Sequence, residues 1–237
     1  MEYRHILFDV SEEIATVTLN RPEARNALTP EMREDLTHAL GEIRKRAGKD
    51  IKAMILTGAG RAFCAGGDVK AMGTSAAAGA GANIALTADF VLATPRGFLM
   101  QAFTRIGLIP DWGGFYILPR LVGMQKAREL IFTGRRVYAE EAKQIGLIYD
   151  VVGQDTAMAE ARSFAKKLAK APTAAIGVAK NILNQSYNQD IRTLSEMEAM
   201  GQSICRDTDY HKEAVRRFAA KEPPLYDWEA MQEAGDD

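Results

Sequence analysis

The chain has 237 residues and a formal net charge of −1, with 30 Lys and Arg against 31 Asp and Glu. This balance excludes the global basic footprint of proteins that bind nucleic acid or anionic membranes, so any anion site must be local. Hydrophobic residues make up 47% of the chain and charged residues 26%, which argues against disorder and predicts one large core with a possible appendage.

The first predicted elements are strands and a helix. Ile6 to Val10 and Ile14 to Leu19 alternate apolar with polar residues, which predicts a β-hairpin. Thr29-Pro30-Glu31 supplies an N-cap, a first-turn proline and an acidic residue, so a helix is expected to begin there and to end near Gly48. The apolar run from Ile51 to Leu56 then predicts a buried parallel strand.

The middle of the chain is rich in small residues, and the second half is mostly helical. Gly60 to Gly81 holds too few large side chains to build a core, but its backbone can approach another backbone or a ligand closely. Pro223-Pro224 is expected to end the last helix. The segments predicted between these are a helix and then a strand over Asn83 to Ala93, and helices over Lys126 to Phe132, Ala139 to Ile145, Asp155 to Lys170, Thr173 to Gln189, Arg192 to Ile204 and Tyr210 to Lys221.

Residue types that bind metals or form disulfides are sparse. Cys64 and Cys205 fit neither a disulfide framework nor a CxxC site, and the three histidines show no ligand spacing, so no metal is expected. The N-terminus has no basic and apolar leader, and no apolar run approaches 18 residues. We therefore expect a cytoplasmic protein with no membrane and no nucleic-acid partner.

Two turns of small residues could present backbone N–H groups to a ligand. The first runs from Phe63 to Asp68, and the second runs from Gly79 to Asn83 and opens a helix, whose first N–H groups are unpaired. Two such turns facing each other would hold an oxyanion. For either turn alone, tight packing of helix against sheet is the better supported interpretation. A nicotinamide site is disfavoured, because Gly79-Ala80-Gly81 lacks the third glycine of that fingerprint.

Asp111 is the only carboxylate in residues 90–122, in the segment Ile109 to Gly114. The apolar and basic surroundings predict a partly buried acid. Burial would raise the pKa of this acid, and a nearby helix N-terminus would lower it. Local sequence alone favours another role, in which Asp111 caps a turn or a helix.

These features, in this order, resemble the crotonase superfamily of enoyl-CoA hydratases and isomerases. The resemblance covers nearly the whole chain and is more specific for the superfamily than for one reaction. The segments that carry it are Leu19 to Pro22, Asn26 to Leu28, Gly60 to Asp68, Ala78 to Gly81, Ile106 to Pro110, Thr133-Gly134, Ala139 to Ala142 and Gly146-Leu147.

The resemblance implies an α/β fold, a crotonase-like spiral of β-β-α units over residues 1–188, with a helical C-terminal trimerisation region over residues 189–237. It implies a homotrimer or a hexamer built as a dimer of trimers. The implied substrate is an acyl-CoA, and no cofactor is expected beyond the CoA moiety of that substrate.

The resemblance also implies roles for the two turns. The backbone N–H groups of Gly67 and Ala80 would bind the thioester oxygen, while Ala65, Gly66 and Asp68 would lie along the pantetheine and adenine. Such donors matter because the α-proton of a thioester is only weakly acidic, and the enolate must be stabilised.

The proton-transferring residue must then be chosen. Hydratases of this family use two glutamates, whose positions correspond here to Asn83 and Phe103, and neither residue can act as a base. Asn83 could bond a water or a carbonyl, or simply line its helix. Asp111 coincides with the aspartate that dienoyl-CoA isomerases use, and its segment resembles isomerases of epoxidised phenylacetyl-CoA. The resemblance thus favours an isomerase with Asp111 as base. A hydratase and a non-catalytic acyl-CoA binder remain alternatives.

Three further residues could contact CoA. Arg25 could meet the phosphates, and Phe218 with Lys221 match the FxxK of the family's C-terminal helix, which can reach a neighbouring subunit's ligand. A solvated surface role is equally consistent with all three. The residues that could line an acyl pocket, or simply belong to the core, are Phe98, Met100, Trp112, Phe115 and Tyr116.

The connection between the two turns is unusually short. Only Val69 to Ala77 separates them, which is too few residues for a parallel crossover. Either the chain carries a deletion or residues near Gly73 or Thr74 are missing from the sequence. The second is favoured because a deletion would remove the strand that leads into Ala80. An intact mass near 26.0 kDa would support the deletion.

Overall fold

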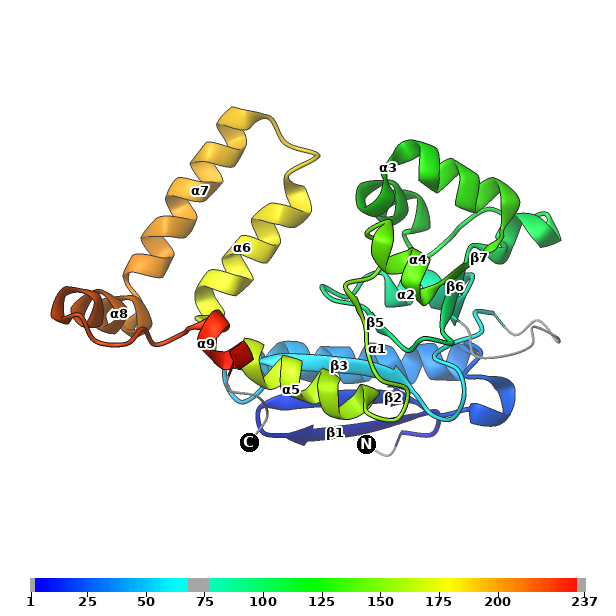
Figure 1. Cartoon of the computed structure of the whole chain (residues 1–237), viewed down its shortest axis with the longest axis horizontal. Helices are drawn as coiled ribbons and strands as arrows, with labels where there is room; N and C mark the ends of the chain where they lie inside the picture. Colours follow the sequence, from blue (N-terminus) through cyan, green and yellow to red (C-terminus); the bar gives the residue numbers. More distant parts are fainter. Residues whose placement is uncertain (1–2, 68–76, 234–237) are drawn as a thin grey trace.

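The protein has an α/β body from which a helical arm projects (Figure 1). The computed structural model describes residues 3–67 and 77–233. Its strands are β1 (Ile6–Ser11), β2 (Ile14–Leu19), β3 (Ala53–Gly58), β4 (Ala77–Ala78), β5 (Leu92–Ala93), β6 (Phe98–Met100), β7 (Arg136–Tyr138) and β8 (Asp150–Val151). Its helices are α1 (Pro30–Arg46), α2 (Ala80–Ala85), α3 (Gly114–Thr133), α4 (Ala139–Gln144), α5 (Ala157–Ala169), α6 (Thr173–Gln185), α7 (Ile191–Arg206), α8 (Asp209–Ala220) and α9 (Trp228–Glu233), with short 3-10 turns at Pro22–Ala24 and Ala102–Ile106.

The N-terminal sheet forms as the sequence predicts, with one difference. β1 and β2 pair antiparallel, and β2 pairs in parallel with β3 after the crossover through α1. The side chain of Thr29 caps α1 by accepting a hydrogen bond of 3.2 Å from the Met32 amide. The expectation of a buried third strand is wrong: β3 is an edge strand of this sheet and only half-buried, with Met54 41% exposed.

A second sheet has the order β4-β6-β7, and its strand β4 leads into the second small-residue turn. β4 pairs in parallel with β6, and Ala77 also forms a parallel bridge with Cys64. The strand that leads into Ala80 is therefore present in the chain of 237 residues, and the choice between a deletion and missing residues stays a prediction. Residues 69–76 of the short connection lie outside the described residues.

Helix α2 lies between two hydrophobic cores. Ala80 belongs to one core and Ala82 to the other, so both faces of the helix are packed. The first core is built from β1, β2 and α1, and the second from α3, α4 and the segments around them. Because α2 is fixed from both sides, its N-terminus has a defined position.

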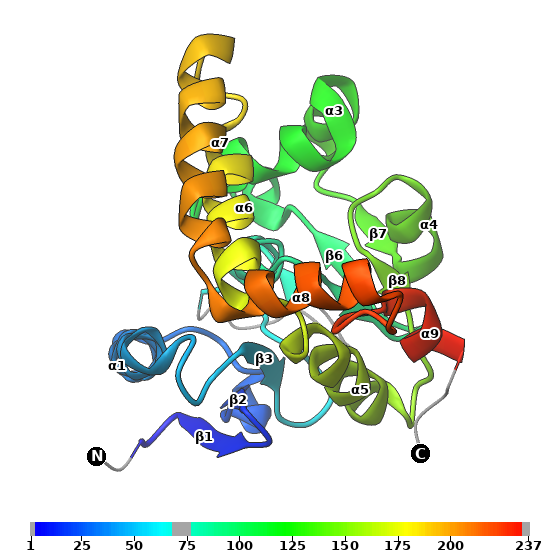
Figure 2. The same ribbon diagram turned by 90° about the vertical axis from the view of Figure 1, so that its left-hand side faces the viewer.

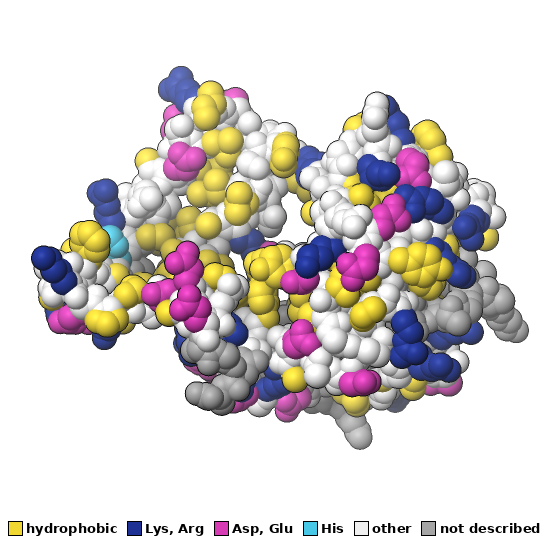
Figure 3. Space-filling view, in the orientation of Figure 1, with side chains coloured by type: hydrophobic (Ala, Val, Ile, Leu, Met, Phe, Trp, Pro, Cys, Tyr) yellow, Lys and Arg dark blue, Asp and Glu magenta, His cyan; other side chains and the backbone are white. Residues whose placement is uncertain are grey.

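The C-terminal helices form the arm. α6 and α7 run side by side away from the body, as Figures 1 and 2 show. No residue of α6 or α8 is buried, and large apolar side chains are exposed along the arm, including Ile191 at 79% and Phe218 at 88% (Figure 3). The projecting pair begins at Thr173, and the boundary between residues 1–188 and 189–237 stays a prediction.

The expectation that the last helix ends at Pro223-Pro224 is wrong, because a further helix follows these prolines. α9 follows Pro223-Pro224, and its Trp228 packs edge-on against Phe164 of α5 with ring centroids 5.4 Å apart. Within residues 3–67 and 77–233, no helix is long and apolar enough to cross a membrane.

Candidate active site

The two turns of small residues lie side by side. The Ala78 amide donates a hydrogen bond of 3.1 Å to the Cys64 carbonyl. Gly66 has a φ of +89°, and a Cβ there would lie 2.6 Å from the carbonyl oxygen of Ala78 and 3.5 Å from the amide nitrogen of Ala80. Only glycine fits this contact, because a side chain would meet backbone atoms and strain φ. The structure thus brings the first turn into contact with the start of α2.

Gly67 and Ala80, the two predicted backbone donors, lie in different local structures. A Cβ built on Gly67 meets no atom of residues 3–67 and 77–233 within 4 Å. Ala80 is the first residue of α2, where a helix leaves its N–H groups without partners inside the helix. The preceding residue, Gly79, is fixed by the hydrogen bond of 2.9 Å that its amide donates to the Met100 carbonyl. The phenyl ring of Phe103 lies 3.6 Å from the Cβ position of Gly79.

Cys64 supports the turn and is a poor nucleophile. Its side chain is fully buried, and a Cβ built on Gly81 would lie 2.8 Å from its Sγ. Burial raises the pKa of the Cys64 thiol to about 11, while a weak contact of 3.5 Å from the Gly66 amide opposes the shift. The thiol is therefore neutral at physiological pH and serves as a small packing group.

Asp111 lies in an exposed turn at the start of α3. The expectation of a partly buried acid is wrong: its side chain is exposed, because the turn lies at the surface. The N-cap of α3 is Gly113, without a side-chain cap, so Asp111 does not cap this helix. Its backbone carbonyl accepts a hydrogen bond of 3.0 Å from the Gly114 amide, and Trp112 between them has a φ of +49°.

Asn83 connects the two parts of the site. It lies three residues after Ala80 and is fully buried. Its Nδ2 donates a hydrogen bond of 2.8 Å to the carbonyl of Asp111, and its Oδ1 accepts one of 2.8 Å from Nε2 of Gln101. The carbonyl that Asn83 bonds belongs to the protein backbone, and a bond from Asn83 to water or to a substrate carbonyl stays a prediction. The sequence reasoning missed Gln101, although it is the only polar residue in the run Phe98 to Phe103.

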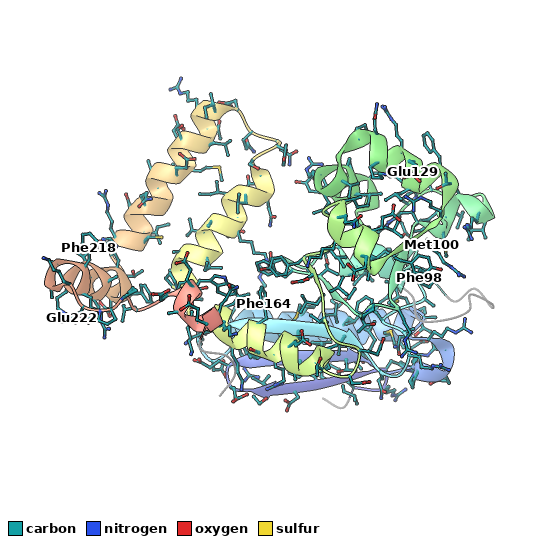
Figure 4. The ribbon with its side chains drawn as sticks, viewed as in Figure 1. Phe98, Met100, Glu129, Phe164, Phe218 and Glu222 are labelled. Carbon is teal, nitrogen blue, oxygen red and sulfur yellow. The ribbon has the colours of Figure 1, made fainter. Side chains whose placement is uncertain are left out.

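The structure brings only some of the CoA candidates together. The Ala65 amide donates a hydrogen bond of 3.0 Å to the carbonyl of Arg25, whose side chain is exposed beside the first turn. Phe218, on α8, lies at the far end of the arm from Phe98 and Met100 (Figure 4), and Lys221 caps the same helix. Asp68 lies outside the described residues.

The predicted acyl-pocket residues divide into two groups. Phe98 and Met100 are buried in a small core cluster, so both belong to the core, as the alternative to an acyl pocket predicted. Trp112, Phe115 and Tyr116 are all more than 40% exposed around the start of α3. In the described part of the chain, no group of three or more His, Cys, Asp and Glu side chains could hold a metal ion.

Comparison with known proteins identifies relatives over more than nine tenths of the chain. A sequence profile of the enoyl-CoA hydratase/isomerase family matches residues 9–77 and 71–229. A probable enoyl-CoA hydratase from Rhodobacter capsulatus is 37% identical over 258 residues, which cover 95% of this chain and 99% of that protein. The 1,2-epoxyphenylacetyl-CoA isomerase of Escherichia coli is 33% identical over 258 residues, which cover 93% and 97%.

The crystal structure of an enoyl-CoA hydratase/isomerase from Cupriavidus metallidurans CH34 superposes with a TM-score of 0.86 at 29% identity, and covers 95% of this chain and 97% of that one. The alignments of 258 residues exceed the 237 residues of this chain, so the two aligned relatives have residues without a counterpart here. The profile match is divided at residues 71–77, within the short connection between the two turns.

Proposed function

Because the chain belongs to the enoyl-CoA hydratase/isomerase family, that is, the crotonase superfamily, we propose that it is an isomerase of an acyl-CoA thioester that moves a double bond or opens a ring. The observation that carries this proposal is the hydrogen bond from Asn83 to the carbonyl of Asp111. It links the backbone of the turn that bears the Asp111 carboxylate to the helix that begins with Ala80. The two positions that correspond to hydratase glutamates carry an amide and a phenyl ring, neither of which can deprotonate water.

In this proposal the thioester oxygen accepts hydrogen bonds from the backbone N–H groups of Gly67 and Ala80. The Asp111 carboxylate removes a proton from the acyl chain, and the electron pair of the broken C–H bond moves into the enolate. The protonated Asp111 then returns the proton to another carbon, so the reaction consumes no water and needs no redox cofactor. Backbone donors held in this way stabilise the enolate without having to reorganise during the reaction.

The CoA moiety would extend from the two turns past Arg25. Ala65 and Gly66 would lie along the pantetheine, and Asp68 would follow them towards the adenine. Phe218 and Lys221 could serve only the site of a neighbouring subunit, because α8 lies at the far end of the arm in its own chain. We therefore propose a homotrimer, or a hexamer of two trimers, in which the exposed apolar side chains of the arm are covered. Sedimentation at micromolar concentration tests this assembly.

Replacement of Asp111 by Asn tests the base, because it keeps the size of the side chain and removes its basicity. General-base catalysis contributes about 10²- to 10⁴-fold, so we expect a loss of that size with enoyl-CoA substrates. Turnover near that of the wild type would eliminate the assignment.

The alternatives predict different behaviour in D2O. Because Asp111 is exposed, its carboxyl exchanges the removed proton with solvent, so an isomerase incorporates deuterium at the α or γ carbon of an enoyl-CoA without adding water to it. The Rhodobacter capsulatus relative bears the name of a hydratase, and a hydratase would instead yield the hydrated product. A binder without catalytic activity would bind acyl-CoA but would neither incorporate deuterium nor form the hydrated product. A small panel of enoyl-CoA and aryl-CoA thioesters would distinguish all three.

A further inference from the structure

The side-chain amide of Asn83 directly connects the first turn of α2 with the turn that holds Asp111. The residue is fully buried, and each end of its amide has a partner at 2.8 Å, Gln101 on one side and the carbonyl of Asp111 on the other. We propose that Asn83 is a positioning residue that fixes Asp111 relative to the Ala80 amide, and that Gln101 orients Asn83. This inference rests on the proposed function, since it assigns the purpose of the same site.

The turn after Asp111 has a backbone conformation that needs external support. Trp112 has a φ of +49° and Gly113 a φ of +77°, two consecutive left-handed residues, and the first of them bears a bulky ring. Such conformations persist only where the surrounding structure holds them. The carbonyl of Asp111 is held by two donors, Nδ2 of Asn83 and the amide of Gly114. A Cβ on Gly114 would lie 2.4 Å from Nδ2 of Asn83, so the turn is closed tightly around this amide.

Gln101 supports the orientation of the Asn83 amide that the Asp111 carbonyl, an acceptor only, requires. Its Nε2 donates to Oδ1 of Asn83, which turns the Nδ2 donor towards the Asp111 carbonyl. The opposite orientation would place two oxygens against each other. Oε1 of Gln101 is buried and has no hydrogen-bond partner among the described residues. A buried acceptor left unpaired lowers stability, so the benefit of Gln101 lies in orienting its neighbour.

A double-mutant cycle tests this role. Asn83→Ala should lower kcat for isomerisation about 10- to 100-fold with KM changed less than about threefold, because small displacements of a reacting group have effects of this size. In an Asp111→Asn background the same change should lower the residual rate less than about threefold, since no carboxylate remains to be positioned. Equal losses in both backgrounds would overturn the proposal, because Asn83 would then act on the oxyanion turns or on the ligand.

Amide hydrogen exchange supplies a readout that does not depend on catalysis. Asn83→Ala should raise exchange in residues 111–114 about tenfold or more. Gln101→Met is the milder variant, which removes the orienting donor together with the unpaired oxygen and should therefore fold if Asn83→Ala does not. It should raise the same exchange about threefold. The matched control is Thr104→Val, which removes a hydrogen bond of 2.8 Å to the carbonyl of Ile131 and should leave residues 111–114 unchanged.

The two hypotheses fail in different ways. Full turnover in Asp111→Asn would refute the proposed base, whatever the exchange of the turn shows. Unchanged exchange at residues 111–114 in both Asn83→Ala and Gln101→Met would refute the positioning role, even if Asp111 proves to be the base.

Discussion

The two sides of the candidate site are held in place by different means. The side with Gly66 and Ala80 is fixed by backbone hydrogen bonds and by contacts that tolerate no side chain, with Cys64 packed beneath it. The side with Asp111 is an exposed turn, held by the side-chain amide of Asn83. The proposed oxyanion donors are therefore fixed by the backbone, whereas the position of the proposed base depends on side chains that can be replaced. This division allows one fold to support different reactions of the same class of substrate.

The largest effect is expected on the backbone side, at Gly66. Gly66→Ala places a Cβ 2.6 Å from the Ala78 carbonyl at a φ of +89°, so the turn must move. We expect the free energy of unfolding to fall by about 2 to 4 kcal/mol, with a lower Tm. Thermal and urea unfolding measure this loss.

Gly67→Ala is the matched control for Gly66→Ala. A Cβ at Gly67 meets no described atom within 4 Å, so stability should change by less than about 1 kcal/mol, while turnover falls because the new methyl group lies beside the proposed oxyanion donor. Equal losses of stability at the two glycines would show that the backbone side is not as tightly packed as described.

Local sequence patterns were sufficient for the elements that form from neighbouring residues. The hairpin, the cap of α1 at Thr29 and the two small-residue turns follow from alternation, capping chemistry and glycine content, and the structure shows all of them. By contrast, β6 and β7 are each only three residues long, which is too short for a periodic pattern. Their paired residues also lie almost 40 positions apart in the sequence. Helix α3 was predicted only in its second half, because Pro119 and Gly123 interrupt a segment that is apolar on all sides.

For the site, the sequence supplied the residues but not their environment. Asp111 was found as a solitary carboxylate, yet its exposure depends on where α3 begins. The interaction of Asn83 with Gln101 and with the Asp111 carbonyl joins residues 18 and 28 positions apart through tertiary structure. Proximity of this kind is not visible in spacing or composition. The contact of Gly66 with Ala80 likewise requires the parallel bridge between Cys64 and Ala77.

Thiol reactivity tests how rigid the backbone side is. The pKa of Cys64 is raised from 9.0 to about 11, so at pH 8 its thiolate population is about 100-fold below that of an ordinary thiol, and burial blocks access as well. In a Cys205→Ser variant, labelling of the remaining thiol should be at least about 100-fold slower in the native protein than in urea. Rapid labelling of the native protein would indicate that the turn opens readily.

The C-terminal end of α3, which lies opposite the end that follows Asp111, should weaken in acid. Arg135 pairs with Glu129 of α3 and with Glu141 of α4. Its guanidinium lowers the pKa of Glu129 to about 2 and also lowers that of Glu141. Since both carboxyls have a lower pKa in the folded than in the unfolded chain, their stabilisation is complete above about pH 4.5 and is lost as the pH falls towards 2.

Both carboxylates of this network are about one third exposed, so we expect a contribution of only about 1 kcal/mol. Arg135→Gln should lower the free energy of unfolding by about this amount at pH 7, and by less at pH 3. Urea unfolding at the two pH values measures the difference. A variant with the same loss at both pH values would show that Arg135 acts through packing and not through its charge.

The smallest effect concerns the ring of Trp112, next to Asp111. The guanidinium of Arg33 on α1 lies 5.5 Å from the centroid of this ring, and an exposed cation–π contact contributes about 0.5 to 1 kcal/mol. Arg33→Met should therefore raise amide exchange in residues 111–114 only about two- to fivefold, well below the effect of removing Asn83. Arg44→Met, an exposed change at the other end of α1, is the control. If Arg33→Met loosened the turn as much as Asn83→Ala, the exposed cation–π contact would support the Asp111 turn as strongly as the buried amide of Asn83. The Asp111 side would then not be held mainly by a buried side chain.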